Sequence, residues 1–190
     1  MTTAVDSTAS SATGTALRRL YFTRFGFTLV WAALLFATGG SMGPFLTTLL
    51  IIYPLFDAAA VFWQLRSNKD SERTKISEWV NIVVSILVAI ALGWASTVSA
   101  SAALVVWGLW AIGAGIPQLV TAVRNRRAGG QVPQMLSGGI SVFAGSAFLF
   151  QGLQGSGAIT GVAGYALLGA VFFLISAIHL TSILRKRVTS

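Results

Sequence analysis

The chain contains no cysteine and few charged residues. Without cysteine, disulfide bonds, thiolate nucleophiles and sulfur-ligated metal sites are all excluded. Only 9% of the 190 residues are Asp, Glu, Lys or Arg, and there is a single histidine, whereas about 25% of the residues in soluble domains are charged. The sequence has no metal-ligand cluster, phosphate-binding loop or pair of catalytic carboxylates. We therefore expect a protein that is not an enzyme and that has no catalytic residues, cofactor or metal.

Long apolar stretches take the place of these groups. Hydrophobic residues make up 55% of the chain, and the mean hydropathy is +0.77. About 20 apolar residues suffice for a helix that crosses a bilayer, and continuous rather than alternating apolar character favours helices over a barrel. The sequence predicts an all-α membrane protein with six transmembrane helices, at Leu20–Thr38, Pro44–Leu65, Ser77–Ala95, Ser101–Val123, Leu136–Gly152 and Ala158–Leu184.

The connections between these stretches predict how the helices are grouped. Every second connection is only about five residues long, which favours three consecutive antiparallel helical hairpins. The hairpins cover residues 20–66, 77–124 and 136–185 of one transmembrane domain at 20–187, and their similar length indicates a weak internal repeat. Residues 1–19 are rich in Ser, Thr and Ala and are predicted to form a disordered cytoplasmic tail.

Basic residues are confined almost entirely to alternate connections. Twelve of the thirteen Lys and Arg residues lie within residues 18–19, 66–75, 124–127 and 185–187, whereas residues 39–43, 96–100 and 153–157 carry no charge. This alternation is the positive-inside pattern, and it predicts a multi-pass protein of the plasma membrane with both termini in the cytoplasm. The net charge of +8 therefore indicates a lipid bilayer, and no nucleic acid, as the partner. Three acidic residues that are mixed with the basic ones are predicted to lie on a solvated surface: Asp70, Glu72 and Glu78.

One acidic residue, Asp57, lies deep within a predicted transmembrane helix. A charge there costs about 2.5–3.5 kcal/mol on insertion scales, so a partner is expected. Arg24 in the first helix lies at a similar depth, and we predict an intramembrane ion pair between Arg24 and Asp57 in the cytoplasmic half. The pair could be a structural clamp, or it could be a gate or proton relay. Further polar residues of the inner half are Asn81, Gln118 and His179.

Tryptophan and small residues predict the packing of the helices. Trp63, Trp79 and Trp94 lie near predicted helix ends, as interfacial aromatic residues do, whereas Trp31, Trp107 and Trp110 are deeper and are expected to pack between helices. Small residues at four-residue spacing allow helices to approach closely. They predict tight packing of the fifth helix against the sixth, or a contact with another copy or another membrane protein, through Ser137, Ser141, Gly145, Gly157 and Gly161.

Several of these features resemble a known bacterial family. They are the segment Tyr53-Pro54-Leu55-Phe56-Asp57 in the second helix, the basic exit at Arg66 and the tryptophan that opens the third helix, Trp79. Together with the three hairpins they resemble the HdeD-like acid-resistance membrane proteins, although Ala58 stands where that family usually has glycine. The resemblance implies a non-enzymatic protein of the bacterial inner membrane that is linked to acid or general stress resistance.

A second functional class is compatible with the same residues. Asp57 could line the path of a small oligomeric transporter or channel. The two classes differ in what they require of the outer half of the bundle, because a path across the membrane needs a polar lining in both halves.

Overall fold

Six long helices make up the part of the chain that the structure describes. The structure is a computed structural model, and it describes residues 2–67, 72–124 and 132–188. Each helix contains a segment long and apolar enough to cross a membrane, and these residues contain no strand. The prediction of an all-α protein with six transmembrane helices is confirmed. The helices are α1 (Thr2–Ala37), α2 (Pro44–Ser67), α3 (Glu72–Val98), α4 (Ala100–Arg124), α5 (Val132–Leu153) and α6 (Gly161–Val188).

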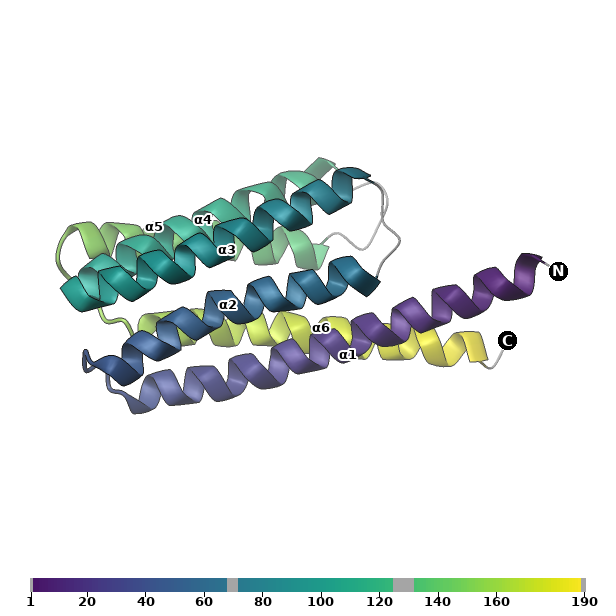
Figure 1. Cartoon of the computed structure of the whole chain (residues 1–190), viewed down its shortest axis with the longest axis horizontal. Helices are drawn as coiled ribbons and strands as arrows, with labels where there is room; N and C mark the ends of the chain where they lie inside the picture. The colour runs from purple at the N-terminus through teal and green to yellow at the C-terminus, as the bar shows by residue number, and fades with distance from the viewer. Residues whose placement is uncertain (1, 68–71, 125–131, 189–190) are drawn as a thin grey trace.

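The helices lie roughly antiparallel along one long axis (Figure 1). Both termini lie at one end of the bundle, which we call the termini end; α2 and α4 also finish there, and α3 and α5 begin there. The short connections from α1 to α2, α3 to α4 and α5 to α6 all lie at the opposite end, which we call the far end. The basic connections and the uncharged ones are therefore at opposite ends of the bundle.

Glycines form two of the turns at the far end. Gly39 and Gly40 have φ angles of 59° and 78°, and Gly155 and Gly157 have φ angles of 67° and 101°. Side chains other than glycine rarely adopt such angles, and glycine at the end of a helix reverses the chain within a few residues. Thr38 Oγ1 also donates a hydrogen bond of 2.6 Å to the carbonyl of Leu35. These turns bring the next helix straight back along the bundle.

The most extensive helix pairs are α4 with α5, α1 with α6, and α2 with α3. The predicted tight packing of α5 against α6 is wrong, because these two helices make few contacts with each other. The small face of α5 meets α4 instead. A Cβ atom built on Gly145 would lie 2.8 Å from the carbonyl oxygen of Gly108, and one on Gly115 would lie 2.8 Å from Cβ of Ser141. Four-residue spacing predicted a close approach correctly, but it did not identify the partner helix.

The remaining residues of the predicted small face have other places in the fold. Gly157 lies in the turn before α6, and Gly161 is the first residue of α6, near the ring of Phe148. Ser137 lines a cavity that is described below. Ser141 makes the one polar bridge between α5 and α6 that the structure describes, because its hydroxyl lies 2.8 Å from that of Tyr165.

Aromatic side chains form the centre of the bundle. Trp31 and Trp107 are 2% and 0% exposed, and their rings stack with centroids 5.6 Å apart. Tyr53 packs on both of them, and the Trp31 indole donates a 2.7 Å hydrogen bond to the carbonyl of Leu49. By contrast, the three tryptophans near the helix ends are exposed. The predicted division between buried and peripheral tryptophans is confirmed.

The structure differs from the prediction for residues 1–19. These residues were predicted to be disordered, but α1 is one continuous helix from Thr2. Alanine is the best helix former, and each Ser or Thr costs only about 0.5 kcal/mol in helix propensity, so a helix nucleated in the apolar segment can extend backwards. The N-terminal part of α1 and the C-terminal part of α6 project together beyond the other helices (Figure 1), and a Cβ on Gly14 would lie 3.0 Å from the Leu184 side chain.

Candidate functional site

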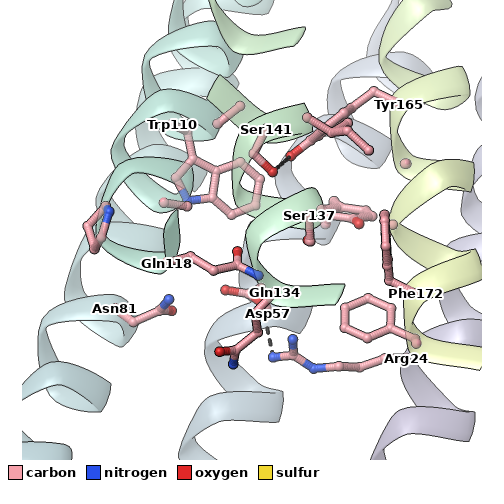
Figure 2. Close-up of a pocket in the computed structure, with 18 of the residues that line it drawn as sticks. Arg24, Asp57, Asn81, Trp110, Gln118, Gln134, Ser137, Ser141, Tyr165 and Phe172 are labelled. Carbon is pink, nitrogen blue, oxygen red and sulfur yellow. Dashed lines mark hydrogen bonds and ion pairs between the residues drawn. The ribbon is translucent and has the colours of Figure 1, made fainter. Parts of the chain in front are cut away.

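A cavity of about 490 Å³ lies between the six helices. On α4 its lining runs from Trp107 to Thr121, and on α3 it is formed by Ser77 and Asn81. Because α4 ends and α3 begins at the termini end, the cavity occupies the half of the bundle next to that end. Its polar lining comes from five helices and includes Arg24, Asp57, Asn81, Gln118, Gln134 and Ser137 (Figure 2).

The two intramembrane charges meet at the wall of this cavity. Arg24 Nη2 lies 3.0 Å from Asp57 Oδ1, and the two side chains are 15% and 22% exposed. The second carboxylate oxygen, Oδ2, accepts a 3.2 Å hydrogen bond from the hydroxyl of Ser85, which is fully buried. The structure thus brings together the two residues that the sequence singled out and adds a third group from α3. The carboxylate is bonded through both of its oxygens.

Arg24 is also held from a fourth helix. Its guanidinium carbon lies 5.2 Å from the centre of the Phe173 ring on α6, within the range in which a cation is attracted to an aromatic face. Figure 2 shows the Arg24 side chain reaching from α1 towards Asp57 across the cavity. The ion pair therefore ties α1 to α2, and its neighbours add α3 and α6.

The three polar residues that the sequence assigned to the inner half are divided by the structure. Asn81 and Gln118 line the cavity, and Asn81 Oδ1 lies 3.3 Å from the Ser85 hydroxyl that also reaches Asp57. His179 is exposed on α6 and does not line the cavity. The lone histidine therefore takes no part in this site.

Two polar features of the site were missed by the sequence analysis. Gln134 and Ser137 stand one helical turn apart at the beginning of α5, and both face the cavity. The sequence of one helix does not distinguish residues that face a cavity from residues that face solvent. The cavity exists only because the other five helices surround these residues. Tyr165 on α6 also lines the cavity and is hydrogen-bonded to Ser141 on α5.

The prediction that Glu78 lies on a solvated surface is wrong. Its side chain is buried, with 8% of its surface exposed, and Gln64 on α2 donates a 3.1 Å hydrogen bond to its Oε1. A buried carboxylate is tolerated where polar groups bond to it. Asp70 lies outside the described residues, and of Glu72 the structure describes only the backbone.

Aromatic side chains close the cavity towards the far end. Tyr53 and Trp107 belong to its lining, and Trp31 stacks behind them. Beyond this layer the core is apolar and fully buried, with Leu35, Leu46 and Leu104 at 0–1% exposure. The polar space therefore reaches about half-way through the bundle and does not continue as a polar path to the far end.

Two hydrogen-bond donors at this site are buried and have no partner among the described residues: Arg24 Nε and Trp107 Nε1. Buried donors are rarely left unpaired, so each exception calls for an explanation. Both residues line the cavity, but the two nitrogens themselves have almost no accessible surface, so a bound molecule can accept from them only after the side chains turn.

The groups that line the cavity can be described by their chemistry. Within the described residues, no three His, Asp or Glu side chains gather to hold a metal ion. The lining offers amide, hydroxyl and indole groups, aromatic faces and one ion pair. Comparisons with protein-family models, with curated proteins and with solved structures found no match for the chain.

Proposed function

We propose that this membrane protein takes up a small polar solute into the cavity from the termini end, as a member of the transporter class. The observation that carries the proposal is the cavity itself, which has the Arg24–Asp57 pair in its wall. Its volume lies within the range of about 300–1,000 Å³ that is typical of ligand pockets. Interiors built only for stability are close-packed, and ionisable residues within a membrane are functional by default.

The aromatic layer decides between a channel and a transporter. An open channel needs a continuous polar lining, and here Trp31, Tyr53 and Trp107 interrupt it. Transporters bind their substrates near the middle of the membrane and expose the site to one side at a time. A site that is polar towards the termini end and closed towards the far end corresponds to one of these two states.

The location of the protein follows from the charges at the two ends. We place the termini end, with its basic clusters, in the cytoplasm, and the uncharged far end outside a bacterial plasma membrane. The site then draws its solute from the cytoplasm in the state described here. No covalent chemistry is assigned to the protein. The proposal also includes association with further copies of the protein. The apolar faces of α3 and α5 are exposed, and either lipid or another copy can cover them.

The transport function can be tested by solute uptake into liposomes. Because the chain lacks cysteine, a Ser137→Cys variant offers a water-soluble thiol reagent only one target, and that target faces the cavity. We expect one or more of a panel of small neutral solutes, amino acids and carboxylates to enter faster than in protein-free liposomes. Modification of the new cysteine should reduce this uptake at least tenfold, because the adduct fills the cavity.

A matched control lies two residues further along α5. Gly139 has open space around it and does not line the cavity, so modification of Gly139→Cys should leave uptake unchanged. The proposal fails if no solute of the panel enters above the background, or if the adduct at position 137 has no more effect than the adduct at position 139.

A second candidate function rests on the resemblance to the HdeD-like proteins. The residues that carry it are the Tyr53–Asp57 segment, Arg66 and Trp79, and the contacts of Asp57 with Arg24 and Ser85 support a structural role for this residue. In this interpretation the protein supports bacterial survival under acid or general stress without transporting a solute. We expect a deletion strain to lose survival after acid challenge and the intact gene to restore it.

An Asp57→Asn strain at matched expression separates the roles of that residue. Survival equal to that of the intact gene assigns the charge to folding alone, and loss of survival assigns it to function. Equal survival of the deletion and complemented strains under acid and other stresses would remove this candidate and leave the transport proposal in place.

A further inference from the structure

We infer that the solute of the cavity is a compact organic carboxylate that is bound together with one proton: its carboxylate on Arg24 and the proton on Asp57. The inference rests on the proposed function, since it names the substrate class of the same site. It follows from three properties of the wall, which are its charge balance, the partly used edge of the guanidinium and the hydrogen bonds around Asp57.

The charge balance of the cavity requires a proton. Among the described lining residues, Arg24 and Asp57 are the only charged ones, and they neutralise each other at 3.0 Å. A carboxylate that enters this space would place two anions against one cation. Such an arrangement drives the protonation of one of the two carboxylates. A neutral site can thus accept an anion only with a proton.

One edge of the Arg24 guanidinium is only partly used by Asp57. Only Nη2 is bonded to Asp57, while Nε, on the same edge of the fork, is buried and unpartnered among the described residues. Two parallel N–H groups on one edge match the two oxygens of a carboxylate. Asp57 fills only one of these positions because its other oxygen is turned to Ser85. A carboxylate ligand can fill both positions once Asp57 has given up its negative charge and the Arg24 side chain has turned its buried Nε towards the cavity.

The hydrogen bonds around Asp57 accommodate that proton. The Ser85 hydroxyl lies 3.2 Å from Asp57 Oδ2 and 3.3 Å from Asn81 Oδ1, but it has one hydrogen and can donate to only one of them at a time. A proton on Asp57 Oδ2 resolves this competition. Asp57 then donates to Ser85, and Ser85 donates to Asn81. All three residues are hydrogen-bonded in the protonated form, so the site accommodates the proton.

Among the described residues of the lining, no other group competes with Asp57 for the proton. Arg24 on α1 is the one cation that faces it, and Tyr53 on α2 and Tyr165 on α6 are the other titratable groups of the lining. Tyrosine hydroxyls remain protonated across neutral pH. Gln118 on α4 and Gln134 on α5 do not titrate. Glu78 on α3 bonds to Gln64 and is not part of the lining.

The other lining residues indicate what kind of body the ligand has. Trp110, Tyr165 and Phe172 present aromatic surfaces to the space beside the ion pair (Figure 2). Trp107, at the aromatic end of the cavity, stacks on Trp31. A carboxylate with a compact apolar or aromatic body fits this shape. A phosphate, with two negative charges, exceeds what one arginine can neutralise.

Benzoate is a suitable probe because it remains ionised between pH 6 and pH 8. We expect it to change the fluorescence of the purified protein, since Trp107 and Trp110 line the cavity. Benzamide, which has the same shape without the charge, should bind at least tenfold more weakly. In a weakly buffered solution, binding of benzoate should remove about one proton from the medium per molecule bound, and its affinity should fall about tenfold for each pH unit between pH 6 and pH 8.

Variants assign the two roles. Arg24→Gln should abolish benzoate binding, whereas Asp57→Asn, which imitates the protonated acid, should retain it and lose the proton uptake. Glu78→Gln, at a buried carboxyl outside the cavity, is the control and should change neither.

The proton count on the unaltered protein keeps the test independent of any folding defect in a variant. Binding of benzoate without proton uptake overturns the inference, and so does equal binding of benzamide. If benzoate fails to bind, the carboxylate assignment is wrong. The transport proposal then still stands if Ser137→Cys blocks the uptake of another solute, so the two failures are distinguishable.

Discussion

Replacement of Gly145 by alanine is expected to separate α4 from α5 and to lower the stability of the bundle by about 3 kcal/mol, at the upper end of overpacking effects. A Cβ at this position would lie 2.8 Å from the carbonyl oxygen of Gly108 and 2.9 Å from the backbone nitrogen of Ile112. Neither atom belongs to a flexible side chain, so the helices themselves must move. Thermal unfolding in detergent, followed by circular dichroism, measures the effect.

Gly108→Ala tests the same contact from the other side. Its Cβ would lie 2.6 Å from the carbonyl oxygen of Gly145 and 2.6 Å from the nitrogen of Leu149, so a similar loss is expected. The two substitutions together should cost less than the sum of the single losses, because the first already separates the helices.

Matched controls lie on the same two helices. Gly113 on α4 and Gly139 on α5 have open space where a Cβ would stand. Alanine there should be neutral or should stabilise the protein by up to about 1 kcal/mol through helix propensity. If the four alanine variants all unfold at the same temperature, the close approach of α4 and α5 is not what stabilises this pair.

The outline of the fold could be predicted because the bilayer imposes it. Apolar length determines where a helix can cross, and the basic clusters at Arg66 and Arg124 show which connections share one end. The association of the helices could not be predicted in the same way. The small face of α5 signals a close approach, but sequence spacing does not tell whether Gly145 meets α4 or α6. The pairing of α1 with α6, the two ends of the chain, leaves no local signal at all.

The candidate site, like the fold, could be predicted only in part. The Arg24–Asp57 pair was predictable because an intramembrane charge requires compensation at its own depth. The cavity was not, because its lining comes from six helices. Gln134 and Tyr165 are unremarkable within their own segments, and Ser137 was assigned to helix packing. Glu78 was assigned to a solvated surface from its charged neighbours, whereas its burial depends on Gln64 of the preceding helix. Sequence therefore predicted the charged pair and missed the space that it faces.

A double-mutant cycle on the ion pair is expected to show strong coupling between Arg24 and Asp57. Asp57→Ala leaves Arg24 buried against Phe173 without its counter-ion, and Arg24→Ala leaves a carboxylate with Ser85 alone. Each single change should cost about 3 kcal/mol, because an unpaired charge in a shielded site is costly. The double variant should cost little more than either single one, since the second change removes the charge that the first had left unpaired. Unfolding in detergent gives all four values.

Arg66 provides the control for this cycle. It stands at the end of α2 and packs on the ring of Phe62, nine residues from Asp57, so Arg66→Ala and Asp57→Ala should cost the sum of their separate losses. Additive losses for Arg24 and Asp57 as well would contradict the pairing.

Asp57→Asn distinguishes a structural clamp from a binding site, because it preserves the hydrogen bond to Ser85 while removing the charge. If Asp57→Asn is as unstable as Asp57→Ala, the charge itself stabilises the bundle. If it is nearly as stable as the unaltered protein, the electrostatic part of the clamp is small, and the charge on Asp57 serves what enters the cavity.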